Sequence, residues 1–312
     1  GFHVRGRFDR VLDIEKCWLQ DDKNNDIRKA VKQFAFENDY SFYDEKNHTG
    51  NIRSLLVRNN LDGEWMVMLM LGSENPEIAG NICEYLQRQF PEISSLWYVI
   101  NTKKNDTFYD LDPVLFSGND YLEERLGKIK LRFGPKSFMQ TNTKQALKLY
   151  EVALNFADLS KEDTLLDLYC GVGSIGLCAA SDVKKLIGVE SVPEAIEWCV
   201  KNSELNGFTN TQFYNTSTEQ LLNGNFDIPE CNKIIVDPPR AGLHPDAIRY
   251  LLNCNPEKLV YVSCNPSTQA RDLELLKEKY KLIKAQPVDM FPYTHHIENV
   301  ALLELKQYEK TQ

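Results

Sequence analysis

The sequence has 312 residues, of which 42% are apolar and 26% are charged, as expected of a globular protein with about two domains. Its longest apolar run, residues 65–71, falls short of the roughly 18 residues that a membrane-spanning helix needs, so we expect a soluble, cytosolic protein that is monomeric. The net charge of −9 argues mildly against a nucleic-acid partner, because phosphate binding depends on Lys and Arg.

The chain begins at Gly1 without a methionine, in a stretch that resembles a strand, so we expect a longer natural protein. Its eight cysteines include no Cys-x-x-Cys pair and are best interpreted as reduced thiols. Basic residues cluster at Arg5, Arg7 and Arg10, and again at Lys128, Lys130, Arg132 and Lys136. Each cluster alone is more simply a solvated face than a binding site.

The first part of the chain mixes short β-rich runs with helical segments, which predicts an α+β domain. The expected strands are residues 52–57, 65–71, 96–100 and 129–133, and the expected helices are residues 27–38 and 76–89. Asp62-Gly63 lies between two apolar runs and predicts a hairpin. Gly134-Pro135 is a breaker pair, so we place a domain boundary there, dividing residues 1–134 from residues 135–312.

The rest of the chain opens with a predicted helix at residues 142–157 and then changes rhythm. Short, almost wholly apolar strands alternate with helices, which is typical of a doubly wound α/β fold with a parallel sheet covered on both faces. The expected strands are residues 164–168, 185–189, 211–214, 233–236, 258–263, 282–288 and 299–305.

A glycine-rich loop follows the first of these strands, with Gly171, Gly173 and Gly176 where the backbone must turn tightly beside a ligand. Glu190 ends the next strand, where a carboxylate can accept hydrogen bonds from both hydroxyls of a ribose. The glycine spacing also fits NAD. Asp167 argues against NAD, because an acid before the loop would repel a pyrophosphate, whereas S-adenosylmethionine has no phosphate and carries an ammonium and a sulfonium that an acidic cleft stabilises.

Two later strand tips carry reactive groups. Asp237-Pro-Pro-Arg240 forms a stiff polar turn after one strand, and Cys264 follows the next. Because parallel strands end at one edge of the sheet, we expect these loops to converge, with nearby cations or helix N-termini lowering the pKa of Cys264. We interpret five other thiols as structural: Cys170, Cys178, Cys199, Cys231 and Cys254. A late loop holds His295, His296 and Glu298; zinc is an alternative, but the spacing matches no common ligand set.

Several of these motifs together resemble one family. They are Ser137-Phe-Met-Gln140-Thr-Asn, Asp167-Leu-Tyr-Cys-Gly-Val-Gly173, Asp237-Pro-Pro-Arg240, Ser263-Cys-Asn-Pro266 and His296-x-Glu298. The chain resembles the RNA (uracil-5-)-methyltransferases, which make 5-methyluridine in ribosomal or transfer RNA. The resemblance implies a Rossmann-like class I methyltransferase domain, preceded by the smaller central, RNA-binding domain of the family.

The resemblance also implies roles for particular residues. It assigns cofactor or target-base binding to Gln140, Tyr169, Gly171, Gly173, Glu190 and Asp237, the nucleophile to Cys264 and the general base to Glu298. Ser174 and Ser217 depart from the usual Asn or Asp and are left unassigned. Cys17 resembles the last of four iron–sulfur ligands in cluster-bearing members, whose other three would precede Gly1. We therefore expect a [4Fe-4S] cluster only in the full-length protein, and no metal in this chain.

The chemistry of uracil fits these residues. Uracil C5 is a poor nucleophile, and attack of the Cys264 thiolate on C6 would activate it; Glu298 would then remove the C5 proton. The expected substrate is RNA, with 23S ribosomal RNA favoured over tRNA. Two alternatives remain: an amino-group methyltransferase that acts on adenine or a protein amide through Asp237-Pro-Pro, and a non-catalytic RNA-binding module.

Overall fold

The computed structural model describes residues 2–7, 9–222 and 228–306, and divides the chain into two compact units. The first consists of Gly1–Glu124 with Phe133–Lys136, and the second of Arg125–Arg132 with Ser137–Gln312. Near Gly134 the chain thus passes from the first unit to the second, back to the first and again to the second. The single boundary placed there stays a prediction. Within the described ranges, no helix is both long and apolar enough to cross a membrane.

The first unit is built on a four-stranded mixed sheet. Its elements are β1 (Phe2–His3), β2 (Val11–Leu12), α1 (Asp22–Glu37), β3 (Ile52–Asn59), β4 (Trp65–Leu71), α2 (Pro76–Gln89), β5 (Ile93–Ile100) and β6 (Val114–Gly118). The sheet has the order β3-β4-β5-β6, and only the pair β4–β5, joined through α2, is parallel. Every residue of β4 is buried, because α1 and α2 pack over one face and a smaller apolar cluster covers the other.

Local chemistry explains where these elements begin and end. The predicted hairpin at Asp62-Gly63 is confirmed, with Gly63 at a φ of 83° between antiparallel β3 and β4. Helix α1 begins five residues before the expected start, because Asp21 caps it by accepting a hydrogen bond from the Lys23 amide. Strand β6 was not among the expected strands, and Gly118 is its last residue.

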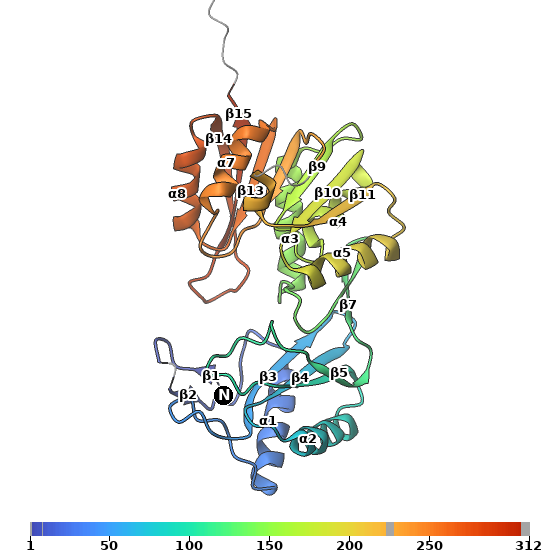
Figure 1. Cartoon of the computed structure of the whole chain (residues 1–312), viewed down its shortest axis with the longest axis vertical. Coiled ribbons are helices and arrows are strands. Elements are labelled where there is room, and N and C mark those ends of the chain that lie inside the picture. The colour runs from blue at the N-terminus through green and yellow to red at the C-terminus, as the bar shows by residue number, and fades with distance from the viewer. Residues whose placement is uncertain (1, 8, 223–227, 307–312) are drawn as a thin grey trace, which may run out of the picture. The chain divides into compact units, whose positions relative to one another are not determined.

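The second unit contains the long α/β segment. Its elements are β8 (Ile129–Phe133), α3 (Thr143–Ala157), β9 (Thr164–Leu168), α4 (Ser174–Ala179), η1 (Ala180–Asp182), β10 (Lys185–Glu190), α5 (Pro193–Leu205), β11 (Thr211–Asn215), α6 (Thr218–Leu222), β12 (Lys233–Val236), α7 (Pro245–Cys254), β13 (Lys258–Ser263), α8 (Pro266–Leu276), β14 (Tyr280–Val288) and β15 (Glu298–Leu305). Seven strands form one sheet in the order β11-β10-β9-β12-β13-β15-β14, with helices packed against it (Figure 1).

The expectation of a wholly parallel sheet is wrong for its last two strands. Strands β9 to β13 are parallel, but β15 runs antiparallel to β13, and β14 runs antiparallel to β15. No helix separates β14 from β15, and such a short connection can only join antiparallel neighbours. The expectation that both faces are covered also fails at this edge, where residues 281–287 of β14 are exposed.

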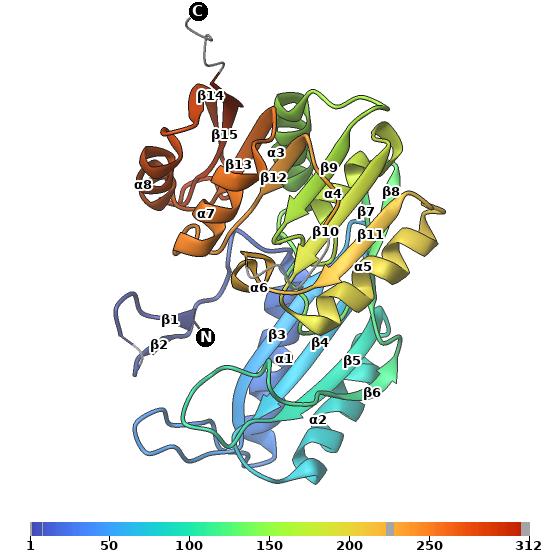
Figure 2. The same cartoon turned by 45° about the horizontal axis from the view of Figure 1, so that its top comes forward.

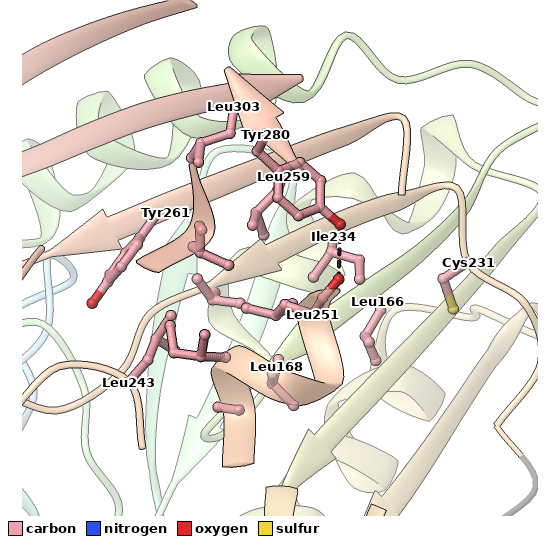
Figure 3. Close-up of a cluster of buried hydrophobic side chains, with 14 of the residues drawn as sticks. Leu166, Leu168, Cys231, Ile234, Leu243, Leu251, Leu259, Tyr261, Tyr280 and Leu303 are labelled. Carbon is pink, nitrogen blue, oxygen red and sulfur yellow. Dashed lines mark hydrogen bonds between the residues drawn. The ribbon is translucent and has the colours of Figure 1, made fainter. Parts of the chain in front are cut away.

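Alternating side chains of the sheet form the core. One set faces α7 and α8, and Figure 3 shows Leu166, Ile234 and Leu259 from three strands around Leu251 of α7. The buried Tyr280 hydroxyl donates a 2.7 Å hydrogen bond to the Leu251 carbonyl. Helices α3, α4 and α5 pack against strands of the same sheet. The reactive groups therefore stand on a rigid layered support.

Strands β7 (Leu122–Leu126) and β8 form a hairpin. Residues 125–132 of this hairpin belong to the second unit, although they precede the continuous segment, Ser137–Gln312, that makes up the rest of it. Asn202 of α5 and Asn206, which directly follows this helix, hold these residues. Asn206 bonds both the amide (2.9 Å) and the carbonyl (2.7 Å) of Lys130, and Asn202 does the same for Arg132 at 2.7 and 3.0 Å. These side-chain amides make the backbone hydrogen bonds that a neighbouring strand would otherwise make. Residues 125–132 therefore belong with this unit.

Candidate active site

The predicted convergence of strand tips is confirmed by the sheet order. Strands β9, β10, β12 and β13 are parallel and lie side by side (Figure 2), so their carboxyl ends share one edge. This edge carries Tyr169, Glu190, Asp237 and Cys264, each directly after or at the end of its strand. Glu298 opens the antiparallel β15 and therefore lies at the same edge.

Asp167, near the end of β9, anchors the glycine-rich loop through a hydrogen bond. Its Oδ2 accepts a 2.8 Å hydrogen bond from the Gly176 amide, whereas Oδ1 is buried with no hydrogen-bond partner among the described residues. Burial raises the pKa of Asp167 to about 7. A β-carbon at Gly176 would lie 2.7 Å from Oδ2, so only glycine allows this approach. An unpartnered carboxylate oxygen here would be stabilised by a cationic ligand.

The loop itself leaves room for a ligand. Gly171 has a φ of 56°, and the place of its missing side chain is open. Its amide donates a 3.2 Å hydrogen bond to Glu190 Oε2. Gly173 also has a positive φ, of 87°, and a β-carbon there would lie 2.8 Å from Leu177, so both backbone conformation and packing favour this glycine. Tyr169 also has a positive φ of 69°, a costly conformation for a side-chain-bearing residue that is common at binding sites.

A cavity of about 700 Å³ opens beside this loop. It is lined by Leu168, Tyr169, Val189, Glu190, Ser191, Thr216, Ser217, Thr218, Pro239, Ala241, Gly242, Leu243, His244, Pro245, Ile248, Arg271, Asp272 and Leu275. Two of the predicted binding residues, Tyr169 and Glu190, line it directly. Gln140, Gly171, Gly173 and Asp237 are not among the lining residues.

The loop after β12 is held by side chains of α8 and of Asn265, which caps the start of that helix. The Arg240 carbonyl accepts hydrogen bonds from Asn265 Nδ2 at 3.1 Å and Thr268 Oγ1 at 3.2 Å. Arg271 donates to the Ala241 carbonyl at 2.8 Å. The direction of the loop is therefore set by α8 as well as by its two prolines.

A buried carboxylate completes this anchor. Asp272 Oδ2 accepts hydrogen bonds from the Leu243 amide and the Tyr261 hydroxyl, both at 2.7 Å. Its Oδ1 accepts from Arg271 Nε at 2.9 Å. Asp272 thus ties the loop after β12 to strand β13, which carries Cys264 at its end.

Cys264 and Glu298 are brought together by the register of β13 and β15. The two antiparallel strands pair Val262 with Val300 and Ser263 with Asn299. One further step in this register places Cys264 opposite Glu298, the spacing at which side chains of adjacent strands contact each other. Glu298 is only 7% exposed, whereas Cys264 is partly exposed at the strand tip.

The charges around the thiol correct one expectation. The pKa of Cys264 is raised, not lowered: burial is the largest cause and the charge of Glu298 the next. Arg240 opposes both through its charge and a side-chain hydrogen bond, but does not overcome them. The sequence showed the arginine but not the burial of the carboxylate opposite the thiol.

The remaining carboxylates share this dry environment. Burial raises the pKa of Glu298, which makes it a stronger base than an exposed glutamate. The pKa of Asp237 is raised well above its ordinary value by burial and then by the charges of Glu298 and Asp167. The charges of Glu298 and Asp167 thus act on Asp237, and those of Glu298 and Asp237 act on the Cys264 thiol.

The other predicted residues occupy nearby segments. Gln140 is half-buried in the loop before α3, and that loop is tied to the loop before Glu298 by a 3.0 Å bond from Asn142 Nδ2 to the Met290 carbonyl. His296 Nδ1 lies 3.1 Å from an Arg240 guanidinium nitrogen. Among the described residues, no three His, Cys, Asp or Glu side chains are grouped so as to hold a metal ion.

Comparisons with known proteins identify the family. Residues 114–306 match the model described as tRNA (uracil-5-)-methyltransferase. Uncharacterized RNA methyltransferases of Bacteroides thetaiotaomicron and Porphyromonas gingivalis are 46% and 43% identical over 98% and 97% of this chain, which covers 68% and 66% of them. The chain belongs to the tRNA (uracil-5-)-methyltransferase family.

A solved structure of the same family agrees. The crystal structure of Pyrococcus abyssi tRNA (uracil-54, C5)-methyltransferase in complex with S-adenosyl-L-homocysteine has a TM-score of 0.78 and 29% identity, covering 95% of this chain and 71% of that one. This match confirms the Rossmann-like fold. The chain spans about two thirds of the length of the curated relatives.

The structure also locates residues to which the sequence gave no role. The loop after β11 brings Thr216, Ser217 and Thr218 to the cavity, so Ser217, left unassigned, lines it. Ser174 instead accepts a 3.2 Å hydrogen bond from the Tyr150 hydroxyl. Because β11 is parallel to β10, the strand-tip rule that found Glu190 would also have found the Thr216 loop.

Proposed function

We propose that this chain methylates C5 of a uridine in RNA with S-adenosylmethionine as the methyl donor. The observation that carries the proposal is the opposition of Cys264 and Glu298 at the end of β13 and β15, because a thiol beside a buried carboxylate supplies the two groups that this chemistry requires. When bound, S-adenosylmethionine supplies an electrophilic methyl group on a sulfonium.

The residues present fit this cofactor. Glu190 stands at the strand tip where a carboxylate accepts hydrogen bonds from ribose hydroxyls, and it lines the 700 Å³ cavity with Tyr169. Asp167 Oδ1, which has no hydrogen-bond partner among the described residues, would be stabilised by the ammonium group of the cofactor. The P. abyssi relative was solved with S-adenosyl-L-homocysteine, the demethylated form of the same cofactor.

The chemistry of the protein's own residues then follows. The Cys264 thiolate bonds to uracil C6, which breaks the C5–C6 double bond and raises the electron density at C5. Asp237 and Gln140 are proposed to hydrogen-bond the imide edge of the base, which must leave its stack to enter. Once C5 is methylated, Glu298 takes the C5 proton, the double bond re-forms, and the thiolate leaves.

The RNA class is a further proposal. We retain 23S ribosomal RNA as the substrate expected from the sequence. Transfer RNA is the second candidate, because it is named for the family and for the P. abyssi enzyme. Mass-spectrometric mapping of 5-methyluridine in both RNA classes from a deletion strain decides between them, since one position should lose its methyl group.

The covalent mechanism is tested with two variants of the full-length protein. With Cys264→Ala, neither methylated RNA nor a protein–RNA conjugate should form. With Glu298→Gln, methyl transfer proceeds but proton removal stalls, so a methylated conjugate should survive denaturing electrophoresis. RNA containing 5-fluorouridine should trap the wild-type enzyme, since fluorine cannot leave as a cation. Normal turnover by Cys264→Ala would favour the amino-group alternative, and absence of S-adenosylmethionine binding would favour a non-catalytic module.

A further inference from the structure

The segments that carry Cys264 and Glu298 are joined behind the site by a buried amide pair. Gln269 of α8 is 2% exposed and contacts both strands. Its Nε2 donates hydrogen bonds to the Tyr261 carbonyl of β13 at 2.8 Å and to the Asn299 carbonyl of β15 at 3.2 Å. Its Oε1 accepts a 2.6 Å hydrogen bond from Asn299 Nδ2.

This pair lies close enough to Glu298 in the chain to affect where that side chain lies relative to Cys264. Asn299 directly follows Glu298 and is the last residue of β15 paired with β13, opposite Ser263. Beyond this step the pairing of β13 with β15 ends, so among the described residues Glu298 is held in the sheet by its pairing with Val288 of β14, and no backbone pairing joins it to Cys264. Gln269 is itself hydrogen-bonded to Tyr261, and it restrains Asn299, the residue next to Glu298.

We propose that Gln269 and Asn299 are positioning residues that hold Glu298 at the distance from Cys264 needed to remove the C5 proton. The inference rests on the proposed function, because it assigns the proton-removal step to Glu298. Attack by Cys264 depends less on this pair, since Ser263 and Asn265 fix the thiol turn separately: Ser263 Oγ donates to the Asn265 carbonyl and accepts from its amide, both at 3.1 Å.

A positioning role predicts a specific kinetic signature. Gln269→Met keeps the side-chain length but removes all three hydrogen bonds. Displacement of a catalytic group by about 1 Å can slow its step on the order of 100-fold, so proton removal should become limiting. Methylated covalent conjugate should then accumulate with natural RNA. Asn299→Ala removes only the bond to Gln269 Oε1 and leaves Gln269 bonded to both carbonyls. This variant should therefore accumulate less conjugate than Gln269→Met.

The experiment uses the full-length protein, radiolabelled S-adenosylmethionine and total RNA from a deletion strain, with labelled conjugate measured after denaturing electrophoresis. Tyr280→Phe is the matched control, because it removes one buried 2.7 Å hydrogen bond of the same unit, to the Leu251 carbonyl, away from the site. This control should lower stability without accumulating conjugate, whereas Gln269→Met should accumulate it while total turnover falls.

The outcomes separate this inference from the proposed function. If Glu298→Gln accumulates conjugate but Gln269→Met and Asn299→Ala lose turnover without it, the amide pair is only structural and the inference is wrong. If Glu298→Gln itself accumulates none, the assignment of the base fails first. Should Gln269→Met not fold, Asn299→Ala decides alone, since accumulation supports the inference and its absence at reduced turnover overturns it.

Discussion

The Asp167 carboxylate accepts the Gly176 amide at 2.8 Å, in an approach that leaves no space for a side chain on Gly176. Gly176→Ala should therefore destabilise the fold by about 1–3 kcal/mol, because the added methyl would lie 2.7 Å from Asp167 Oδ2 and 2.9 Å from Leu186 Cδ1. Urea unfolding measures the loss. Gly80→Ala on α2, with nothing within 4 Å, is the control and should leave stability unchanged or higher.

The same carboxylate predicts how stability changes with pH. Its pKa is about 7 in the fold against an ordinary 3.8, so the folded chain holds the proton more tightly than the unfolded chain. Its contribution to stability is full below the ordinary pKa and declines as the pH rises through the folded pKa, by roughly 4 kcal/mol at most. Unfolding free energies at about pH 5 and about pH 8 should show this decline, and Asp167→Asn should reduce it.

An exposed carboxylate provides the contrast for that measurement. Lys258 lowers the pKa of Asp158, which is therefore already ionised across this pH range. Asp158→Asn should leave the decline of the wild-type protein unchanged. An equally steep decline in Asp167→Asn would mean that the other buried carboxyl groups, Asp237 and Glu298, account for the whole effect.

Cofactor binding depends on Glu190 in a way that calorimetry can measure. Glu190→Gln should weaken S-adenosylmethionine binding by on the order of 1.5–3 kcal/mol, because two ribose hydroxyls would lose a charged acceptor. The change also weakens hydrogen bonds that order the loop, from the Gly171 amide at 3.2 Å and the Val192 amide at 2.9 Å. Glu197→Gln, at an exposed position on α5, should bind normally. Binding of NAD in place of S-adenosylmethionine would refute the cofactor assignment.

The sequence predicted which strand tips meet at one edge of the sheet. Tyr169, Glu190, Asp237 and Cys264 could be placed together because each follows a short apolar strand, and parallel strands end at one edge. The proximity of Glu298 to Cys264 could not be derived in this way, since it depends on the reversed direction of β15. An apolar run of that length has the same pattern in either direction.

Interactions between distant side chains were also beyond sequence reasoning. Gln269 lies on a helix where a polar residue is ordinarily solvent-exposed, yet it is buried against two strand ends. The raised pKa of Cys264 likewise results from burial and from Glu298, which is 34 residues away in the chain. Both effects depend on which residues the fold brings together, so neither their direction nor their size can be assigned from the sequence.

The reactivity of Cys264 provides the last prediction, which requires no RNA. Only the thiolate reacts with iodoacetamide, so the alkylation rate at Cys264 should rise with pH and reach half its maximum above the ordinary pKa of a cysteine. Glu298→Gln removes a negative charge that raises this pKa and should shift the profile to lower pH. Arg240→Gln removes a charge and a hydrogen bond that lower it and should shift the profile to higher pH.

The two opposite shifts make this measurement informative, because a general loosening of the fold would move both variants in one direction by exposing the thiol. Quantitative mass spectrometry of the peptide that contains Cys264 separates its reaction from those of the other seven cysteines. Glu197→Gln, which removes an exposed charge from α5, should leave the profile where it is in the wild-type protein. A shift to higher pH in Glu298→Gln would contradict the opposition of the thiol and the carboxylate on which the proposed mechanism depends.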